Sequence, residues 1–562
     1  MKRIRVYLSI AVLGGALFIP FLGEAHLFDW DEINFAEASR EMIETGNYTQ
    51  TQVDFRQFWE KPPLFFWLQA AGMQMFGINA FGARFPNAIC GILTLILLYA
   101  IGRQLKDDAF AGFWVLCYAA SILPQFYFKS GIIDPWFNLF IFLSVYAFIR
   151  YLQHQQSLPW LCIAGVAAGL SALTKGPVGI GLIGITIAVY YFLNRFRQFP
   201  SLVHLVILLL CVFLPIAPWV FIEVSQNGTW FIREFFLYQM RLATTEDASH
   251  GGFPGYHVVV ILFFCFPAST FALRNMIKSD TESEPVAQFR KWMLILFWVV
   301  LIVFSIVQTK IAHYSSMAYF PLTFLAALRL SQMQLMSTVE KVMLAVTGYV
   351  FAILLIAVPY LLQHPDILTP MIKDAFTREA LQADGNWWGG EWLIGVFMAA
   401  GLTLSLIWAV QQRTRIAIAV LIFTSMLSIN LANNCITPRI ERYSQGAMVD
   451  FFVEKSTVDC YTDIAGFKSY AHLFYGKRKQ SDVNNPVFLK WVSAQGMQKN
   501  ALTAMEFRQA YSRWLLEGNI DKPAYFVSNT RKAPQYDAKP QLKRIGSKNG
   551  FYFYVREPQA VQ

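Results

Sequence analysis

Long apolar runs alternate with short polar loops along most of this chain, and lysines and arginines gather in every second loop. Runs of roughly 16 to 22 apolar residues can cross the hydrocarbon core of a bilayer as helices. With 56% hydrophobic and only 15% charged residues, the chain has too little polar surface to fold in water. The sequence therefore predicts an α-helical integral membrane protein. We place about thirteen spans, near 6–22, 82–101, 109–124, 133–150, 159–174, 177–194, 202–222, 256–273, 291–307, 314–330, 340–362, 391–411 and 415–434.

The basic loops predict the orientation, because Lys and Arg in short loops stay on the cytoplasmic side of a membrane. They carry Lys2, Arg3, Arg5, Arg103, Lys106, Arg195, Arg197, Arg274, Lys278, Arg290, Lys291, Arg329, Lys341, Arg413 and Arg415. The N-terminus is then cytoplasmic, and an odd number of spans places the C-terminal segment on the outer face. Topology and lipid headgroups also account for the net charge of +10, so nucleic acid is not expected as a partner.

Two domains are expected from the change in composition after the last apolar run. Residues 1–434 form the membrane domain, whose first outer loop covers 23–81, and residues 435–562 form a soluble domain on the outer face. The soluble part mixes β-rich pieces with helical stretches, which predicts a small α/β fold. It contains no phosphate-binding loop, zinc spacing or nucleophile elbow, so the sequence assigns it no chemistry.

The first outer loop carries the most patterned polar sequence of the chain. Asp29 followed by Glu32 three positions later predicts a capping box, and Gly46 predicts the end of the helix that follows. Asp31 and Glu32 would then lie in the first helical turn, where the helix dipole favours carboxylates. They are either catalytic acids or caps of a surface helix.

The same loop continues into Glu60-Lys61-Pro62-Pro63. Two prolines stiffen this elbow, and neighbouring side chains of an extended segment point in opposite directions. Glu60 and Lys61 would therefore serve two adjacent subsites, one for a cation or hydroxyl and one for an anion. The alternative is a pair of side chains that snorkel to the membrane surface.

Further ionisable or polar residues lie at the outer ends of the predicted spans. They are Lys129, Asp134, Lys175, Arg241, Lys310, His313 and Tyr314. Such residues are candidates for function, because burying an unpaired charge in a membrane is costly. For Asp134 the alternative is an N-cap before Pro135, and for the lysines it is contact with headgroups.

Three motifs together resemble a known family. They are Asp31-Glu32-x-x-Phe35-Ala36-Glu37-x-x-Arg40-Glu41-Met42, the elbow at 60–63, and Leu173-Thr174-Lys175-Gly176-Pro177. This pattern resembles the polyprenyl-phosphate-dependent glycosyltransferases of the GT-C class, in particular the bacterial lipid A aminoarabinose transferases and the protein O-mannosyltransferases. The resemblance covers roughly residues 1 to 330 with good spacing. It implies the GT-C fold and an enzyme of a bacterial inner membrane with a periplasmic C-terminal domain.

The resemblance also implies a reaction and roles for the residues. A sugar would move with inversion from a polyprenyl-phosphate carrier to a hydroxyl or phosphate of lipid A, another glycolipid or a protein. Asp31 would act on the acceptor proton, with Glu32 and Asp134 as further catalytic acids. Cations would stabilise the phosphate leaving group. Residues expected around donor and acceptor are Glu60, Lys61, Lys129, Lys175, Arg241, Lys310, His313 and Tyr314.

The chain departs from the aminoarabinose transferases at two places. Asn34-Phe35 stands where they usually carry Arg-Tyr, and Gln239 stands where they carry His. The first change removes a cationic phosphate contact and the second removes a metal ligand. A divalent cation at Glu60 would then need His250, His257 or His313, because one carboxylate alone is a poor zinc site. No other cofactor is expected.

Two other functions fit a chain with many spans and charges on its outer side. One is a transporter or flippase of lipid-linked sugars, and the other is a non-catalytic assembly subunit. A transporter needs polar groups or broken helices near the bilayer midplane. The polar residues of this sequence gather at one end of the spans, which favours an enzyme.

Overall fold

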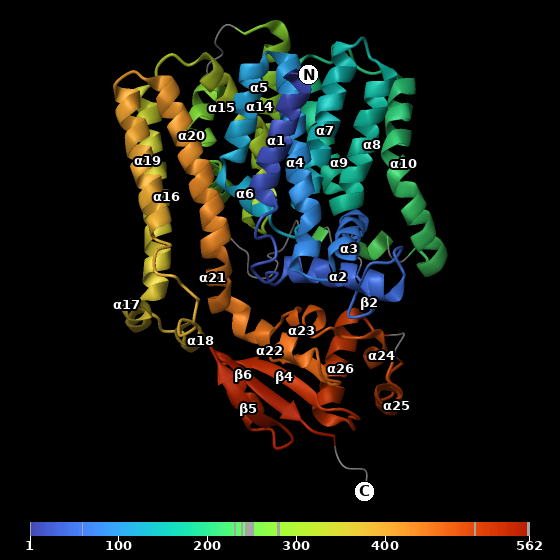
Figure 1. Ribbon diagram of the computed structural model, residues 1–562. Coiled ribbons are helices and arrows are strands. Elements are labelled where there is room, and N and C mark those ends of the chain that lie inside the picture. Colours follow the sequence, from blue (N-terminus) through green and yellow to red (C-terminus); the bar gives the residue numbers. More distant parts are fainter. Residues whose placement is uncertain are drawn as a thin grey trace.

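In the computed structural model a bundle of long helices stands on a layer formed by the first outer loop, and the C-terminal domain lies beyond that layer (Figure 1). The structure describes residues 2–58, 60–229, 232–235, 237, 240–241, 252–277, 282–498 and 502–558. The N-terminus lies at the end of the bundle farthest from the C-terminal domain (Figure 1). The two ends of the bundle therefore differ, because only one of them carries the loop layer and the C-terminal domain (Figure 1).

The bundle is built from the predicted apolar runs. Its helices are α1 (Lys2–Phe18), α4 (Ala80–Leu105), α5 (Asp108–Ala119), α6 (Ile122–Tyr127), α7 (Asp134–Gln153), α8 (Leu158–Lys175), α9 (Val178–Leu193), α10 (Leu202–Asn227), α12 (Tyr256–Phe264), α13 (Ala268–Ile277), α14 (Glu284–Ile306), α15 (Tyr319–Gln332), α16 (Thr338–Gln363), α19 (Leu393–Val410) and α20 (Thr414–Leu431). Helix α8 packs against α7 and α10, and α19 packs against α16 and α20.

The predicted multi-span membrane protein is confirmed. Eight helices of the described residues are long and apolar enough to cross a membrane, or nine if one bent pair is a single span. Several of the other apolar helices, such as α5 and α9, are shorter than 18 residues. The expected number of thirteen spans therefore stays a prediction.

Three predicted spans differ from simple straight helices. The run at 256–273 is broken into the helices α12 and α13. The helix axis bends by 118° between them, next to Pro267. Proline lacks a backbone donor and clashes with the preceding turn, which explains the break. The run at 314–330 begins as the 3₁₀ helix η1 (Ala312–Ala318) before α15. The last span continues as one helical stretch over Thr414–Lys455, so the expected start of the soluble segment at 435 lies inside it.

That last stretch contains four further elements beyond α20. They are η3 (Ala432–Ile436), α21 (Thr437–Glu441), η4 (Arg442–Gly446) and α22 (Ala447–Lys455). The elements η3 and η4 are π-helical turns. The stretch connects the bundle directly to the C-terminal domain (Figure 1).

The first outer loop folds into a layer of short elements. They are α2 (Asp31–Thr45), the antiparallel pair β1 (Gln52–Val53) and β2 (Arg56–Gln57), and α3 (Leu64–Phe76). Helix α2 ends at Gly46 with a φ of 68°, as predicted. The predicted capping box is absent from this described loop, since Trp30 holds the N-cap position and no side chain caps the helix.

The C-terminal domain is the predicted α/β fold. Its four-stranded sheet has the order β3-β4-β6-β5, with β3 and β4 parallel and the other pairs antiparallel. The strands are β3 (Tyr461–Ala465), β4 (Ala524–Asn529), β5 (Lys543–Lys548) and β6 (Phe551–Arg556), and the helices are α23 (Ala471–Phe474), α24 (Gln480–Val483), α25 (Pro486–Ala494), α26 (Ala504–Glu517) and α27 (Ala533–Asp537). Helix α26 lies in the crossover that parallel strands require. Its buried face packs Trp514 and Tyr511 against Phe488.

Candidate functional site

Lys61 interacts electrostatically with four charged side chains next to the end of the bundle that faces the C-terminal domain. Burial lowers the pKa of Lys61. Nearby carboxylates raise this pKa, and a nearby ammonium lowers it further. The groups whose charges act on this ammonium are Glu60, Asp31, Lys175 and Asp134. They come from the elbow, the start of α2, the end of α8 and the start of α7. The fold thus brings together residues up to 144 positions apart, from Asp31 to Lys175.

Asp134 is paired with Lys175 and lies close to His313 at this site. Its Oδ1 accepts a hydrogen bond from Lys175 Nζ at 2.6 Å, and its Oδ2 lies 3.6 Å from His313 Nε2. The ammonium of Lys175 also lies 4.6 Å from the ring centroid of Tyr314. Asp134 does not cap α7, in which Ile133 holds the N-cap position. Its carboxylate therefore orients Lys175 and His313 rather than the start of its own helix.

Asp31 is the exposed acid of the group. It is the first residue of α2, and within the part of the chain that the structure describes its side chain makes no hydrogen bond or ion pair. Its charge still acts on Lys61. An exposed carboxylate beside a cation can accept a proton from a molecule bound between them.

Glu32 differs from its neighbour Asp31, because all of its acceptor positions are occupied. Arg84 donates to Oε1 at 2.7 Å and to Oε2 at 2.8 Å, Gly131 N donates to Oε1 at 2.5 Å, and Phe28 N donates to Oε2 at 2.8 Å. An ionised carboxylate has about four such positions. The expectation of a catalytic Glu32 is therefore revised: the residue holds three segments of the chain together.

Two lysines that were expected at the donor site are bonded to the protein itself. Lys310 Nζ donates to three carbonyl oxygens at the end of α14, at 2.6, 2.6 and 3.2 Å, which uses all of its donors. Lys129 Nζ donates to the carbonyl oxygen of Pro20 at 2.6 Å and to Asn434 Oδ1. Lys310 thus caps a helix, where a cation is favourable, and Lys129 joins three segments.

Glu60 and Arg241 line a large cavity between the first outer loop and the C-terminal domain. Its volume is about 790 Å³. Side chains of the C-terminal domain that also line it include Asp463, His472 and Arg508. Sequence reasoning missed these residues, because no motif or spacing in the C-terminal segment indicates that they face the loop.

A buried ion pair fixes the C-terminal domain against the loop. Arg478 Nη1 donates to Asp54 Oδ1 at 2.8 Å, and both side chains are almost fully buried. Arg40 of α2 donates to the carbonyl oxygen of Arg478 at 2.8 Å. Glu41 accepts from the backbone N–H groups of Asp54 and Phe55 and so holds the turn that carries the pair.

The described residues offer little support for a metal at Glu60. No three His, Cys, Asp or Glu side chains among them gather as metal ligands. His257 Nδ1 lies 3.1 Å from Ser315 Oγ, and His313 faces Asp134. Gln239 and His250 lie outside the described residues. A cation at Glu60 therefore stays a prediction.

Asp29→Asn is expected to stabilise the protein at neutral pH by about 1 to 3 kcal/mol. Burial raises the pKa of Asp29 to about 6, although its Oδ1 accepts from Tyr470 N at 3.3 Å. The folded state then binds more protons than the unfolded state between pH 4 and 6, so this residue lowers stability as the pH rises through that window. Asn keeps the acceptor and removes the charge.

Thermal unfolding of the detergent-solubilised protein at several pH values between 4.5 and 8 would measure this effect. Glu24→Gln is the matched control, because Glu24 is exposed in the same loop. An unchanged pH dependence in Asp29→Asn would contradict the prediction.

Known proteins match this chain in sequence and in fold. A family model described as dolichyl-phosphate-mannose-protein mannosyltransferase matches residues 60–220. The undecaprenyl phosphate-alpha-4-amino-4-deoxy-L-arabinose arabinosyl transferase of Pseudomonas paraeruginosa is 26% identical over 338 residues, which cover 58% of this chain and 59% of that protein. The enzyme of the same name from Pseudomonas savastanoi pv. phaseolicola is 26% identical over 57% of this chain and 61% of its own length. The match thus spans about three fifths of these relatives.

Solved structures extend the likeness to almost the whole fold. ArnT from Cupriavidus metallidurans in the apo state gives a TM-score of 0.73 at 18% identity, covering 99% of both chains. The same protein bound to undecaprenyl phosphate gives a TM-score of 0.71 at 17% identity. These findings confirm the resemblance that the three motifs indicated. The chain is a multi-span membrane protein with the fold of these structures, and its sequence is similar to transferases that are named for undecaprenyl phosphate.

Proposed function

We propose that this protein is an inverting glycosyltransferase that moves a sugar from a polyprenyl-phosphate carrier to an acceptor hydroxyl or phosphate. The observation that carries the proposal is that the charges of the exposed Asp31 and of Lys175 both act on Lys61 at one end of an apolar bundle. A lipid-borne phosphate needs both features, since its chain lies in the membrane and its charge requires cations. The sequence match to the mannosyltransferase family covers Lys61, Asp134 and Lys175.

The chemistry follows from the positions of these groups. The acceptor oxygen forms a bond to the anomeric carbon while the bond from that carbon to the phosphate oxygen breaks, which inverts the centre. Asp31 takes or orients the acceptor proton. Lys61 stabilises the negative charge that grows on the leaving phosphate, and Lys175, held by Asp134, adds a second positive charge.

The acceptor is a glycolipid or a protein that is presented on the outer face of the bacterial inner membrane. The curated relatives are named for transfer of aminoarabinose from undecaprenyl phosphate. This chain has the buried Asn34 on α2 where their pattern places Arg, so its phosphate contacts rest on other residues. We therefore propose the same class of carrier lipid without assigning the same sugar.

We propose a cytoplasmic N-terminus and a periplasmic C-terminal domain. The basic loops support this orientation through the positive-inside rule. The N-terminus also lies at the opposite end of the bundle from Asp31, Lys61 and the C-terminal domain (Figure 1). The reaction would then take place on the periplasmic side.

Comparison of cellular glycolipids and glycoproteins by mass spectrometry tests the function. Cells that lack the gene should lose a mass that equals one sugar residue from one class of molecule, and the parent gene should restore it. The Asp31→Asn form should not restore it. Identical profiles with and without the gene would instead favour transport or an assembly role.

Lys61→Arg is expected to extend binding of a polyprenyl phosphate to higher pH. Burial lowers the pKa of Lys61, so its charge is lost at a lower pH than that of an ordinary lysine. Arginine stays protonated throughout, and the alkaline limb of binding should move up by about one pH unit or more. The measurement is binding of undecaprenyl phosphate to the purified protein from pH 7 to 10.5.

Lys373→Arg serves as the control, because Lys373 is exposed in another outer loop. It should keep the parent's pH dependence. The role of Lys61 would be refuted by an alkaline limb that is the same in Lys61→Arg and in the parent.

A further inference from the structure

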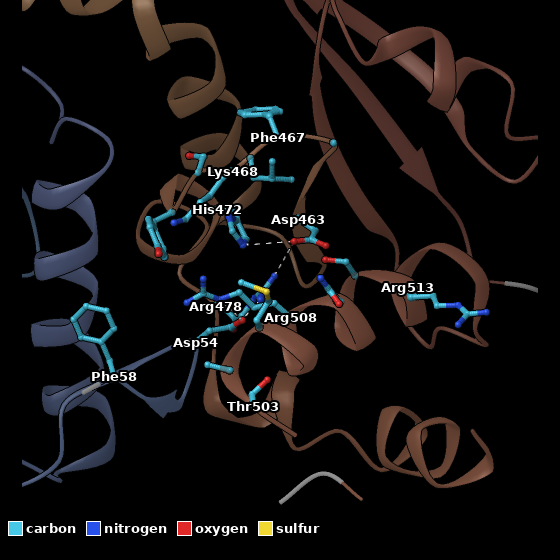
Figure 2. A pocket seen from close by; sticks show the side chains of 18 of the residues that line it. Asp54, Phe58, Asp463, Phe467, Lys468, His472, Arg478, Thr503, Arg508 and Arg513 are labelled. Carbon is cyan, nitrogen blue, oxygen red and sulfur yellow. Dashed lines mark hydrogen bonds and ion pairs between the residues drawn. The ribbon is translucent and has the colours of Figure 1, made fainter. Parts of the chain in front are cut away.

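The cavity between the first outer loop and the C-terminal domain has the size of a ligand site. Its volume of about 790 Å³ falls within the range of about 300 to 1,000 Å³ that is common for pockets of small molecules. One wall includes Asp54, Gln57, Phe58 and Glu60, and the other comes from β3, α23, α26 and the turns that follow them. Figure 2 shows charged side chains from both walls around it.

Positive charge exceeds negative charge on the walls. The acidic residues are Asp54, Glu60 and Asp463, and the basic ones are Arg241, Lys468, Arg478, Arg508 and Arg513. Two of the arginines are already neutralised, since Arg478 pairs with Asp54 at 2.8 Å and Arg513 with Glu517 at 3.0 Å. Arg508 Nε lies 3.8 Å from Asp54 Oδ2, an ion pair without a hydrogen bond, and its guanidinium lies 5.0 Å from the ring centroid of Tyr470, so its hydrogen-bonding capacity is not used by a carboxylate. Lys468 and Arg508 are thus able to bind an anion.

Two buried acceptors on the same walls lack hydrogen-bond partners among the described residues. They are His472 Nδ1 and Asp463 Oδ2, and the two residues are only 7% and 4% exposed. Burial lowers the pKa of His472 well below its usual value, so the ring is neutral. With its one N–H on Nε2, which lies 3.5 Å from Asp463 Oδ1, Nδ1 is an acceptor.

Buried polar atoms of this kind usually have a partner, and the lone pairs of these two acceptors call for O–H or N–H donors from a ligand. A saccharide supplies several hydroxyl donors on one small frame. The aromatic rings of Phe467 and Tyr470 also line the cavity and can pack against the apolar face of a sugar ring.

We propose that this cavity binds a saccharide that carries a phosphate or carboxylate group. Its hydroxyls donate to His472 and Asp463, and its anionic group lies against Lys468 and Arg508. The inference rests on the proposed function in that the saccharide is the polar part of the acceptor.

The cavity also adjoins the reacting groups. Glu60 lines it and precedes Lys61 in the elbow. Lys468 Nζ lies 4.1 Å from the ring centroid of Trp30, the residue before Asp31. A saccharide held by Lys468 would therefore lie beside the proposed base, and the C-terminal domain would select the acceptor.

Binding to the purified full-length protein in detergent, without any carrier lipid, tests the inference independently of sugar transfer. The probes are N-acetylglucosamine 6-phosphate, glucuronic acid, N-acetylglucosamine and inorganic phosphate, measured by calorimetry or ligand-observed NMR. At least one of the two anionic sugars should bind at least ten times more tightly than the neutral sugar and than phosphate alone. The preferred anionic sugar identifies the charged group.

Variants separate this site from general attraction of anions. Lys468→Met and Arg508→Met should each weaken binding of the preferred sugar at least tenfold. Lys490→Met removes an exposed charge from the same domain, outside the cavity, and should leave binding unchanged. Equal losses in all three variants, or phosphate binding as tight as that of the sugars, would overturn the inference.

Hydrogen exchange of the parent protein gives a readout that does not depend on the folding of any variant. The bound sugar should slow exchange in 463–472 and 503–512. Absence of both binding and protection at millimolar sugar would also refute the site. Retained binding together with absent sugar transfer in cells would instead count against the proposed function alone.

Discussion

Replacement of Asp31 by Asn is expected to lower the rate of sugar transfer by about 100-fold or more. Asparagine keeps the size and polarity of the side chain but cannot take the proton of the acceptor. The residue is exposed and makes no hydrogen bond or ion pair within the described part of the chain, so its loss should not disturb the fold. The rate is measured as the amount of modified acceptor formed over time in membranes, by mass spectrometry.

Binding of undecaprenyl phosphate distinguishes lost chemistry from lost donor affinity. It should change little in Asp31→Asn, because Lys61 and Lys175 remain. Glu24→Gln removes an exposed acid from the same loop and should transfer sugar at the parent's rate. A parent-like rate in Asp31→Asn would exclude this residue as the base.

The membrane domain could be predicted from sequence because the bilayer sets the length of each span. All thirteen apolar runs are helical in the structure, at least in part. The break next to Pro267 had a visible signal, since proline inside an apolar run disrupts the helix. No signal in the sequence indicated that the last helix continues to Lys455. Once a helix leaves the hydrocarbon region, the bilayer no longer limits it.

Part of the site could be predicted for the same reason. Asp31, Lys61 and Lys175 lie near ends of apolar segments, so their order along the chain predicts their depth in the membrane. Whether they face one another depends on how helices that are distant in the sequence pack together. The family resemblance indicated that these residues share one site, and their spacing did not.

The role of a single side chain was harder to predict. Asp31 and Glu32 are neighbours in sequence, yet only Glu32 meets Arg84, 52 positions away. The cavity between the first outer loop and the C-terminal domain depends on a pair between Asp54 and Arg478, which are separated by 424 positions. Local patterns carry no information on contacts of this kind.

Arg84→Met is expected to destabilise the protein by about 3 to 5 kcal/mol, because it leaves the carboxylate of Glu32 buried without its partner. The side chains of the pair are 4% and 3% exposed. Glu32→Gln should also be strongly destabilising. All four hydrogen bonds to the Glu32 carboxylate come from donor N–H groups, so the amide NH₂ of Gln would have to face at least one of these donors. Thermal unfolding in detergent measures both effects.

Two further variants make the interpretation specific. The double variant Glu32→Gln with Arg84→Met should lose less stability than the sum of the single changes, because it leaves no unpaired charge. Arg103→Met breaks a surface pair with Asp108, whose side chain is 72% exposed, and should cost no more than about 1 kcal/mol. Glu32 would belong with Asp31 in the chemistry if Glu32→Gln folded as stably as the parent and lost only sugar transfer.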